Sequence, residues 1–194
     1  MKTKAPQITA QVFSETSPIV SAFFEFGYLK QLFRQGWLLN GISAERCESV
    51  AEHSFGVAVI GMLLAEAYFP DMDMLKILKM SLIHDFGEVY AGDFTPAEGV
   101  SPREKHQLEK ESVTRIFERL PQGEIYLALW EDFESGTSPE AQLVRQLDKL
   151  EMALQASYYE HQAYGNLTDF YTSAAQHISD PRLRVILDDL LAIR

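Results

Sequence analysis

The chain has almost no cysteine. Its 194 residues include a single one, Cys47, so no disulfide can form within the chain and zinc sites built from several thiolates are excluded. No histidine is spaced to activate Cys47, and we expect it to pack in the core rather than to act as a nucleophile. The shortage of cysteine is typical of a reducing compartment and favours a cytoplasmic location.

Basic residues are also scarce. Seventeen Lys and Arg stand against 28 Asp and Glu, which gives a formal net charge of −11. The basic residues form no dense patch, so nucleic acid, whose binding depends on neutralised phosphates, is disfavoured as a partner. An acidic protein that binds a small anion needs a locally positive site, and a bound divalent cation can supply one.

Long apolar runs are the third shortage. Residues 1–11 lack the apolar core of a signal peptide, and the densest apolar segment, 19–29, is interrupted by Glu25. We find no run of about 18 apolar residues and therefore expect no membrane-spanning segment and no membrane partner. Hydrophobic residues at 46% and charged residues at 23% indicate a globular chain rather than a disordered one.

Helical periodicity covers most of the chain, and no window alternates as a half-buried strand does, so we predict an all-α fold. Residues 1–15 show no periodicity and are expected to be a loose lead-in, with one domain over 16–194. Segment 36–46 is turn-rich and predicts a loop. The expected helices are about 18–34, 49–67, 74–85, 102–120, 124–133, 138–164, 167–177 and 181–192.

Polar residues that can bind metal interrupt these apolar helices. His53 lies early in the second helix, His84 and Asp85 end the third, and Asp148 lies among core leucines, where a carboxylate needs compensation. A surface pair at a helix end would also explain His84–Asp85, and Asp148 could instead turn to solvent beside Lys149. Two imidazoles and two carboxylates suit Mn, Co, Fe, Ni or Zn better than calcium, which prefers oxygen ligands.

The order His53, His84–Asp85, Asp148 resembles the HD-domain metal-dependent phosphohydrolases. Within them the chain is most similar to the group of the 5'-deoxynucleotidases and HD-domain-containing protein 2. The resemblance spans roughly residues 23–160. The segments that carry it are Glu48–Ser54, His84–Asp93, Lys105–His106 and Arg145–Lys149.

This resemblance implies a single HD-domain helical bundle that forms a homodimer and removes phosphate from (deoxy)nucleoside 5'-monophosphates. The four residues would hold one divalent ion (Co, Mn, Fe, Ni, Mg or Zn), with open positions for water and substrate, as catalytic sites keep. The ion would polarise a phosphoryl oxygen and activate the attacking water. Glu88, four residues after His84, is the expected proton-handling group. Asp93 matches a second acidic residue of the family, although a turn aspartate is the plain alternative.

Phosphate recognition in an acidic chain also calls for a guanidinium. Arg46, in the predicted loop before the helix that carries His53, is the first candidate. The family's bacterial enzyme has an arginine directly before a tryptophan where this chain has Gly36–Trp37, so selectivity for deoxyribose is not implied. Arg34 could take the place of that arginine, and Trp37 could pack against the sugar or base.

Other activities stay open. An HD-fold di-iron oxygenase needs additional histidines, of which only His106 is available, and carboxylate di-iron bundles need a Glu-x-x-His motif that is absent. Cyclic-dinucleotide phosphodiesterases carry lysine at the position of Glu88. The remaining alternatives are an HD phosphohydrolase that acts on another phosphorylated metabolite or nucleotide, and a non-catalytic regulatory module that binds metal through the same ligands.

Overall fold

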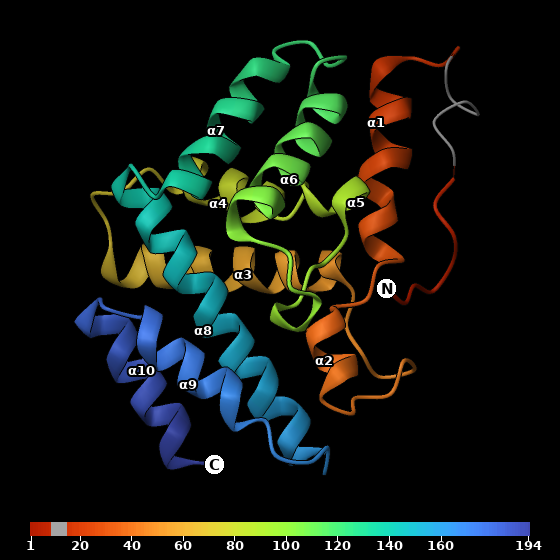
Figure 1. Cartoon of the computed structure of the whole chain (residues 1–194). Helices are drawn as coiled ribbons and strands as arrows, with labels where there is room; N and C mark the ends of the chain where they lie inside the picture. The colour runs from red at the N-terminus through yellow and green to blue at the C-terminus, as the bar shows by residue number, and fades with distance from the viewer. Residues whose placement is uncertain (9–14) are drawn as a thin grey trace.

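Helices account for the regular structure of residues 1–8 and 15–194, the part of the chain that a computed structural model describes (Figure 1). In this part, two isolated bridges, Thr3 with Leu32 and Phe33 with Ser49, are the only β pairings. The predicted all-α fold is confirmed. The helices are α1 Pro18–Phe26, η2 Gly27–Lys30, α2 Gln35–Leu39, α3 Val50–Tyr68, α4 Met74–Ile83, α5 Glu88–Ala91, η3 Pro96–Glu98, α6 Pro102–Phe117, α7 Gly123–Ser135, α8 Pro139–His161, α9 Thr168–His177 and α10 Pro181–Ala192.

Most of the predicted helix starts are correct because the capping signals are local. Helices α1, α6, α8 and α10 each begin with proline in the first turn after a serine or aspartate whose side chain accepts a backbone N–H. α3 has a full capping box, in which Ser49 and Glu52 bond each other's backbone N–H groups. These caps fix the first turn of α3, which carries His53.

The first predicted helix is too long, and the predicted loop contains a short helix. α1 ends at Phe26, and by Leu32 the chain has become extended: the Leu32 carbonyl accepts the N–H of Val50 at 2.9 Å, and the Glu48 carbonyl accepts the N–H of Arg34 at 3.1 Å. These bonds tie residues 32–34 to the start of α3. α2 follows at once, inside the segment expected to be a loop.

α3 is the central helix of the bundle. It crosses the middle of the molecule and packs against α4 and α8 (Figure 1). By length and composition alone α3 could cross a membrane, contrary to the expectation that no such segment exists. Its contacts with α4 and α8 bury Val57 and Gly61, so the helix forms part of the protein core.

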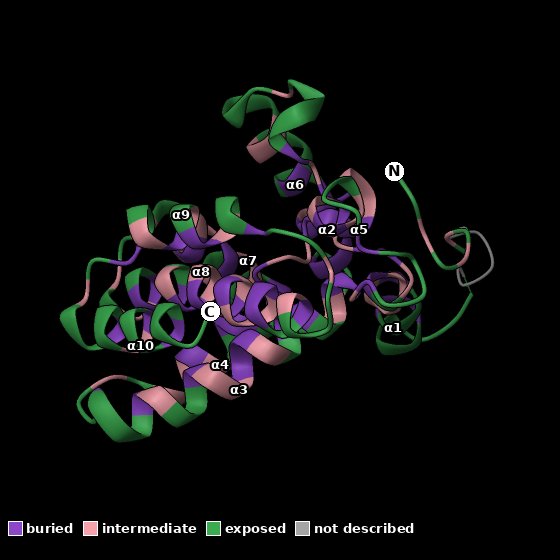
Figure 2. Cartoon of the chain, turned by 90° about the horizontal axis from the view of Figure 1, so that it is seen from below, coloured by how far each residue is buried: buried purple, intermediate pink, exposed green. Residues whose placement is uncertain are grey.

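The core has two parts. The larger one joins α3 and α4 to α8, α9 and α10 through residues such as Val57, Leu147 and Leu187. The second joins α1, α6 and α7 around Ile116 and Trp130. Seen from below, α9 and α10 carry exposed outer surfaces around a buried interior (Figure 2). Segment 84–93 contacts both parts, because Val89 belongs to the second and the ring of His84 packs against Phe133 of the larger one.

Residues 1–8, the first part of the expected lead-in, make contacts with the helical domain. The N–H of Lys4 donates to the Gln31 carbonyl at 2.7 Å, and the N–H of Lys2 donates to Gln35 Oε1 at 2.8 Å. Gln7 Nε2 also donates to the Val89 carbonyl at 3.2 Å. The segment therefore lies against α2 and α5. The rest of the predicted lead-in, apart from Glu15, lies outside the described residues.

Candidate active site

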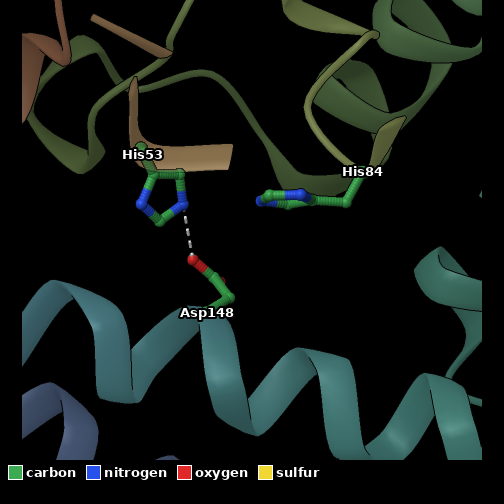
Figure 3. A group of neighbouring side chains, drawn as sticks. All are labelled: His53, His84 and Asp148. Atoms are coloured by element: carbon green, nitrogen blue, oxygen red, sulfur yellow. Dashed lines mark ion pairs between the residues drawn. The ribbon is translucent and has the colours of Figure 1, made fainter. Parts of the chain in front are cut away.

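The four predicted metal ligands meet at one place. His53 comes from α3, Asp148 from α8, and His84 directly follows the last residue of α4 (Figure 3). Asp85 is the next residue along the chain. His53 Nε2 lies 3.1 Å from Asp148 Oδ1 and 3.7 Å from Asp85 Oδ2, and His84 Nε2 lies 3.3 Å from the same Asp85 oxygen. Ligand atoms of His53, His84 and Asp148 lie within 4.8 Å of one another.

Unpartnered polar atoms make this place a candidate metal site. In the described part of the chain, seven buried side-chain N or O atoms make no hydrogen bond, and three of them are His53 Nε2, His84 Nε2 and Asp85 Oδ2. A fourth is Oε2 of the adjacent Glu88. The two imidazole nitrogens lie 3.1–3.7 Å from carboxylate oxygens without hydrogen bonds of good geometry, and a cation between them would satisfy all these atoms. Two nitrogens and two carboxylates fit a divalent transition metal.

Hydrogen bonds outside the site fix the tautomers of both imidazoles. His53 Nδ1 lies 2.6 Å from Glu151 Oε2, and His84 Nδ1 lies 2.7 Å from the Ser81 carbonyl. When each Nδ1 carries the proton, each Nε2 presents a lone pair to the site. Neither Glu151 nor Ser81 was singled out from the sequence, although Glu151 follows Asp148 by three residues on α8 and so shares its face.

The charges in the site compensate one another. Burial and the nearby Arg34 charge act to lower the pKa of His53, but Glu151 and Asp148 outweigh them and raise it to about 10. Burial acts to raise the pKa of Asp85 and of Asp148, yet the histidines, with Lys149 beside Asp148, hold both well below the usual range. Both carboxylates are therefore ionised, and His53, which is protonated near neutral pH without an ion, would give up its Nε2 proton to a bound metal.

Asp148 combines the two interpretations that its sequence context allowed. Its Oδ2 pairs with Lys149 Nζ at 2.9 Å, while its Oδ1 faces His53. The ion pair with Lys149 thus leaves one carboxylate oxygen for the metal site.

Glu88 lies beside the ligands, although the helix does not continue to it. α4 ends at Ile83, the backbone turns through residues 84–87, and α5 begins at Glu88. Burial, with the charges of Asp85 and Asp93, raises the pKa of Glu88 well above its ordinary value, and Arg34 opposes that rise only in part. A buried carboxyl group of this kind can hold a proton near neutral pH and exchange it with a reacting group.

Asp93 enters the site through a turn that requires glycine. Gly92 has φ +92°, a conformation that side chains with a Cβ rarely adopt. Asp93 Oδ2 then accepts the N–H of Gln35 at 2.6 Å, and its Oδ1 lies 3.2 Å from Arg34 Nη1. Asp93 is therefore more than a turn residue, because its side chain joins α2 to the site.

Of the two candidate arginines, Arg34 is the one that the fold brings to the site. Its Nη1 lies 3.7 Å from Asp85, 3.5 Å from Glu88 and 3.2 Å from Asp93. Arg46 is exposed and does not line the cleft, so the structure does not support it as a phosphate ligand. The extended backbone at 32–34 explains the difference, because it places Arg34 beside α5.

A cleft of about 1210 Å³ opens on these residues. Trp37 forms part of its wall: the indole is buried, donates to Glu48 Oε1 at 2.7 Å, and stacks on Phe170 of α9 with ring centroids 3.9 Å apart. Lys105 of α6 and Lys149 of α8 line the cleft as well. The sequence motifs included both lysines, but no role was predicted for them.

His106 lies apart from the cluster of His53, His84 and Asp148. Its Nδ1 pairs with Glu134 at 3.0 Å, and its ring stacks on Trp130. Cys47 is buried as predicted, and burial raises the pKa of its thiol to about 12, which leaves it unreactive.

Known proteins are similar to this chain in sequence. The human protein named 5'-deoxynucleotidase HDDC2 is 36% identical over 173 residues, which cover 87% of this chain and 82% of the human protein. The protein of the same name from Dictyostelium discoideum is 40% identical over 157 residues, covering 75% of this chain and 81% of that protein.

Solved structures of other proteins are similar to this chain in fold. The PH0347 protein from Pyrococcus horikoshii OT3 superposes with a TM-score of 0.76 at 31% identity, over 90% of this chain and 99% of that one. A predicted metal-dependent phosphohydrolase from Magnetospirillum magnetotacticum MS-1 gives a TM-score of 0.68 at 26% identity, over 90% of each chain. The family described as "HD domain" matches residues 26–188, which include all four metal-site residues. The chain therefore belongs to the HD domain family.

Proposed function

We propose that this chain is a metal-dependent phosphohydrolase that removes the phosphate from (deoxy)nucleoside 5'-monophosphates. One observation carries the proposal: the unpartnered atoms of His53, His84 and Asp85 converge beside a buried Glu88 at an open cleft. The relatives named 5'-deoxynucleotidase support the choice of substrate. A divalent ion held by these residues and Asp148 would polarise the phosphoryl group and lower the pKa of the attacking water.

The chain's own cations would orient the phosphate. Arg34 presents a guanidinium fork that suits a phosphate, and Lys105 lines the same cleft. The three carboxylates around Arg34 hold its side chain in place before substrate arrives. Glu88 would exchange a proton during hydrolysis, and Asp93, fixed by the N–H of Gln35, would keep Arg34 in position and face the leaving oxygen.

The nucleoside would extend away from the metal along the cleft. The cleft volume of about 1210 Å³ is sufficient for a nucleotide, since small-molecule sites are commonly about 300–1,000 Å³. Phe170, which stacks on the buried Trp37, provides an aromatic wall. Stacking on aromatic side chains tolerates any base, so we propose broad base acceptance.

The test is phosphate release from a panel of 5'-mononucleotides with ribose and deoxyribose sugars, using metal-free protein with added Co²⁺, Mn²⁺ or Mg²⁺. We expect release that depends on the metal and stops when a chelator is added. Release from other phosphate esters alone would instead favour an HD phosphohydrolase of a different metabolite. A stoichiometric bound metal without release from any ester would refute the hydrolase and favour a regulatory metal-binding module.

We also propose that the protein is a homodimer. α3 and α4 pack side by side and together expose Phe55, Leu63, Leu75 and Leu82, which are between 48% and 66% exposed. Several large exposed apolar side chains on two packed helices favour association. Light scattering should give twice the chain mass, and Leu63→Glu should reduce it to the monomer mass. A monomeric wild-type protein would contradict the proposal.

The proposed location is the cytoplasm, which the single cysteine supports. Fractionation of cells that produce the protein should place it in the cytosolic fraction. Recovery only from membranes or from the medium would contradict this location.

A further inference from the structure

A second buried carboxylate lies behind the metal site, on the side away from the cleft. Glu151 follows Asp148 by three residues on α8, and its Oε2 lies 2.6 Å from His53 Nδ1. The two side chains are 9% and 0% exposed, respectively. Glu151 is not among the residues that line the cleft, so it does not reach substrate.

The facing helix leaves room for Glu151. A Cβ atom added to Gly56 of α3 would lie 2.5 Å from Glu151 Oε1 and 3.1 Å from its Cγ and Cδ. A side chain at position 56 would therefore push the carboxylate away from His53. The Glu151 carboxylate can lie beside His53 because Gly56 has no side chain.

The other imidazole is held differently. His84 Nδ1 bonds the neutral carbonyl of Ser81 at 2.7 Å, whereas His53 Nδ1 faces a full carboxylate. A carboxylate fixes the tautomer of an imidazole more strongly than a carbonyl does and also increases the basicity of the opposite nitrogen.

We propose that Glu151 is a positioning residue of the metal site: it holds the proton of His53 on Nδ1 and so directs the Nε2 lone pair to the ion. The inference rests on the metal site of the proposed function but not on the identity of the substrate. Outer partners of this kind alter metal affinity by about 10- to 100-fold.

Glu151 could alternatively bind an ion itself. Ligand atoms of Glu48, His53 and Glu151 also lie within 4.8 Å of one another. Two contacts disfavour a second ion: Trp37 Nε1 already donates to Glu48 at 2.7 Å, and His53 Nδ1 already faces Glu151. The number of bound ions separates the two roles.

The experiment is calorimetric titration of metal-free full-length protein with Co²⁺ and Mn²⁺. We expect one ion per chain, bound about 10- to 100-fold more weakly by Glu151→Ala and less weakened by Glu151→Gln, which retains an acceptor for the Nδ1 proton. Gly56→Ala should also weaken binding of the ion, because its added Cβ displaces the Glu151 carboxylate although residue 151 is not substituted.

Two matched controls test for a merely structural effect. Gly27→Ala lies directly after α1 and outside the metal site, where the added Cβ would meet no atom within 4 Å. Glu160→Gln lies on α8 and alters a glutamate that bonds the N–H of Leu167 and the side chain of Arg194. Both should bind the ion with wild-type affinity, whatever their thermal unfolding temperatures.

The proposal would be overturned if Glu151→Gln and Gly56→Ala both bound the ion as tightly as the wild type. This test holds even if Glu151→Ala does not fold. Two ions per wild-type chain, with one lost in Glu151→Gln, would make Glu151 a ligand instead. A wild-type chain that binds no ion would refute both this inference and the proposed function. Weakened binding in the variants of a protein that releases no phosphate would support the inference and refute the function.

Discussion

Replacing Arg34 by alanine tests whether this side chain binds the phosphate. Arg34 Nη1 lies within 3.7 Å of three carboxylates, and its side chain is only 15% exposed. In the variant these carboxylates lose their compensating charge and face an incoming phosphate anion. Hydrogen bonds to charged groups contribute about 1.5–3 kcal/mol. At about 1.4 kcal/mol per factor of ten, kcat/KM should fall roughly 10- to 150-fold.

The assay is the initial rate of phosphate release from 5'-mononucleotides at saturating Co²⁺ or Mn²⁺. Arg34→Lys should be intermediate, because lysine keeps the charge but loses the planar fork. Arg46→Ala is the matched control: Arg46 is exposed and outside the cleft, so its loss should leave kcat/KM unchanged. Affinity for the metal should not fall in Arg34→Ala, since a positive charge near the ion is removed.

Two results would refute this reasoning. The first is a kcat/KM for Arg34→Ala within twofold of the wild-type value. The second is a larger loss in Arg46→Ala than in Arg34→Ala.

Three further variants test other parts of the structure. Glu88→Gln should retain the metal but lose about 10²- to 10⁴-fold in kcat, since it cannot exchange a proton, and an unchanged kcat would remove Glu88 from the mechanism. Phe170→Ala should raise KM for nucleotides without altering that for a small phosphate ester, and equal changes would contradict an aromatic wall for the nucleoside. Lys76→Met breaks ion pairs of 2.9 and 3.2 Å with Asp132 and Glu140 and should lower the free energy of unfolding by about 1 kcal/mol at pH 7. Because these pairs lower the pKa of both carboxyl groups in the folded state, their contribution should persist above about pH 4.5 and disappear as the pH falls, so a difference unchanged at pH 3 in denaturant titrations would contradict it.

The fold class and the candidate metal ligands could be predicted from the sequence because much of the signal for them lies within short segments. Caps such as Ser49 and prolines in first turns lie within a few residues of the helices they start. His53 and Asp148 stood out because ionisable groups in apolar helical stretches need compensation. The order of these residues along the chain resembles that in the HD-domain phosphohydrolases, and this resemblance implied that they meet in space.

The points that the sequence left open or missed depend on tertiary contacts. The choice of Arg34 over Arg46 follows from the pairing of residues 32–34 with the start of α3, which has no local signature. Glu151 became informative only when α8 was packed against α3, because its partner His53 is far away in the sequence.

The central claim is that His53, His84, Asp85 and Asp148 hold one divalent ion. Anomalous diffraction from crystals of the protein grown with Co²⁺ locates the ion directly. We predict a single strong peak per chain, at coordination distance from His53 Nε2, His84 Nε2 and the two aspartates. A strong peak at Glu48 and Glu151 instead, or no peak near His53 and His84 in crystals of Co²⁺-loaded protein, would contradict the account.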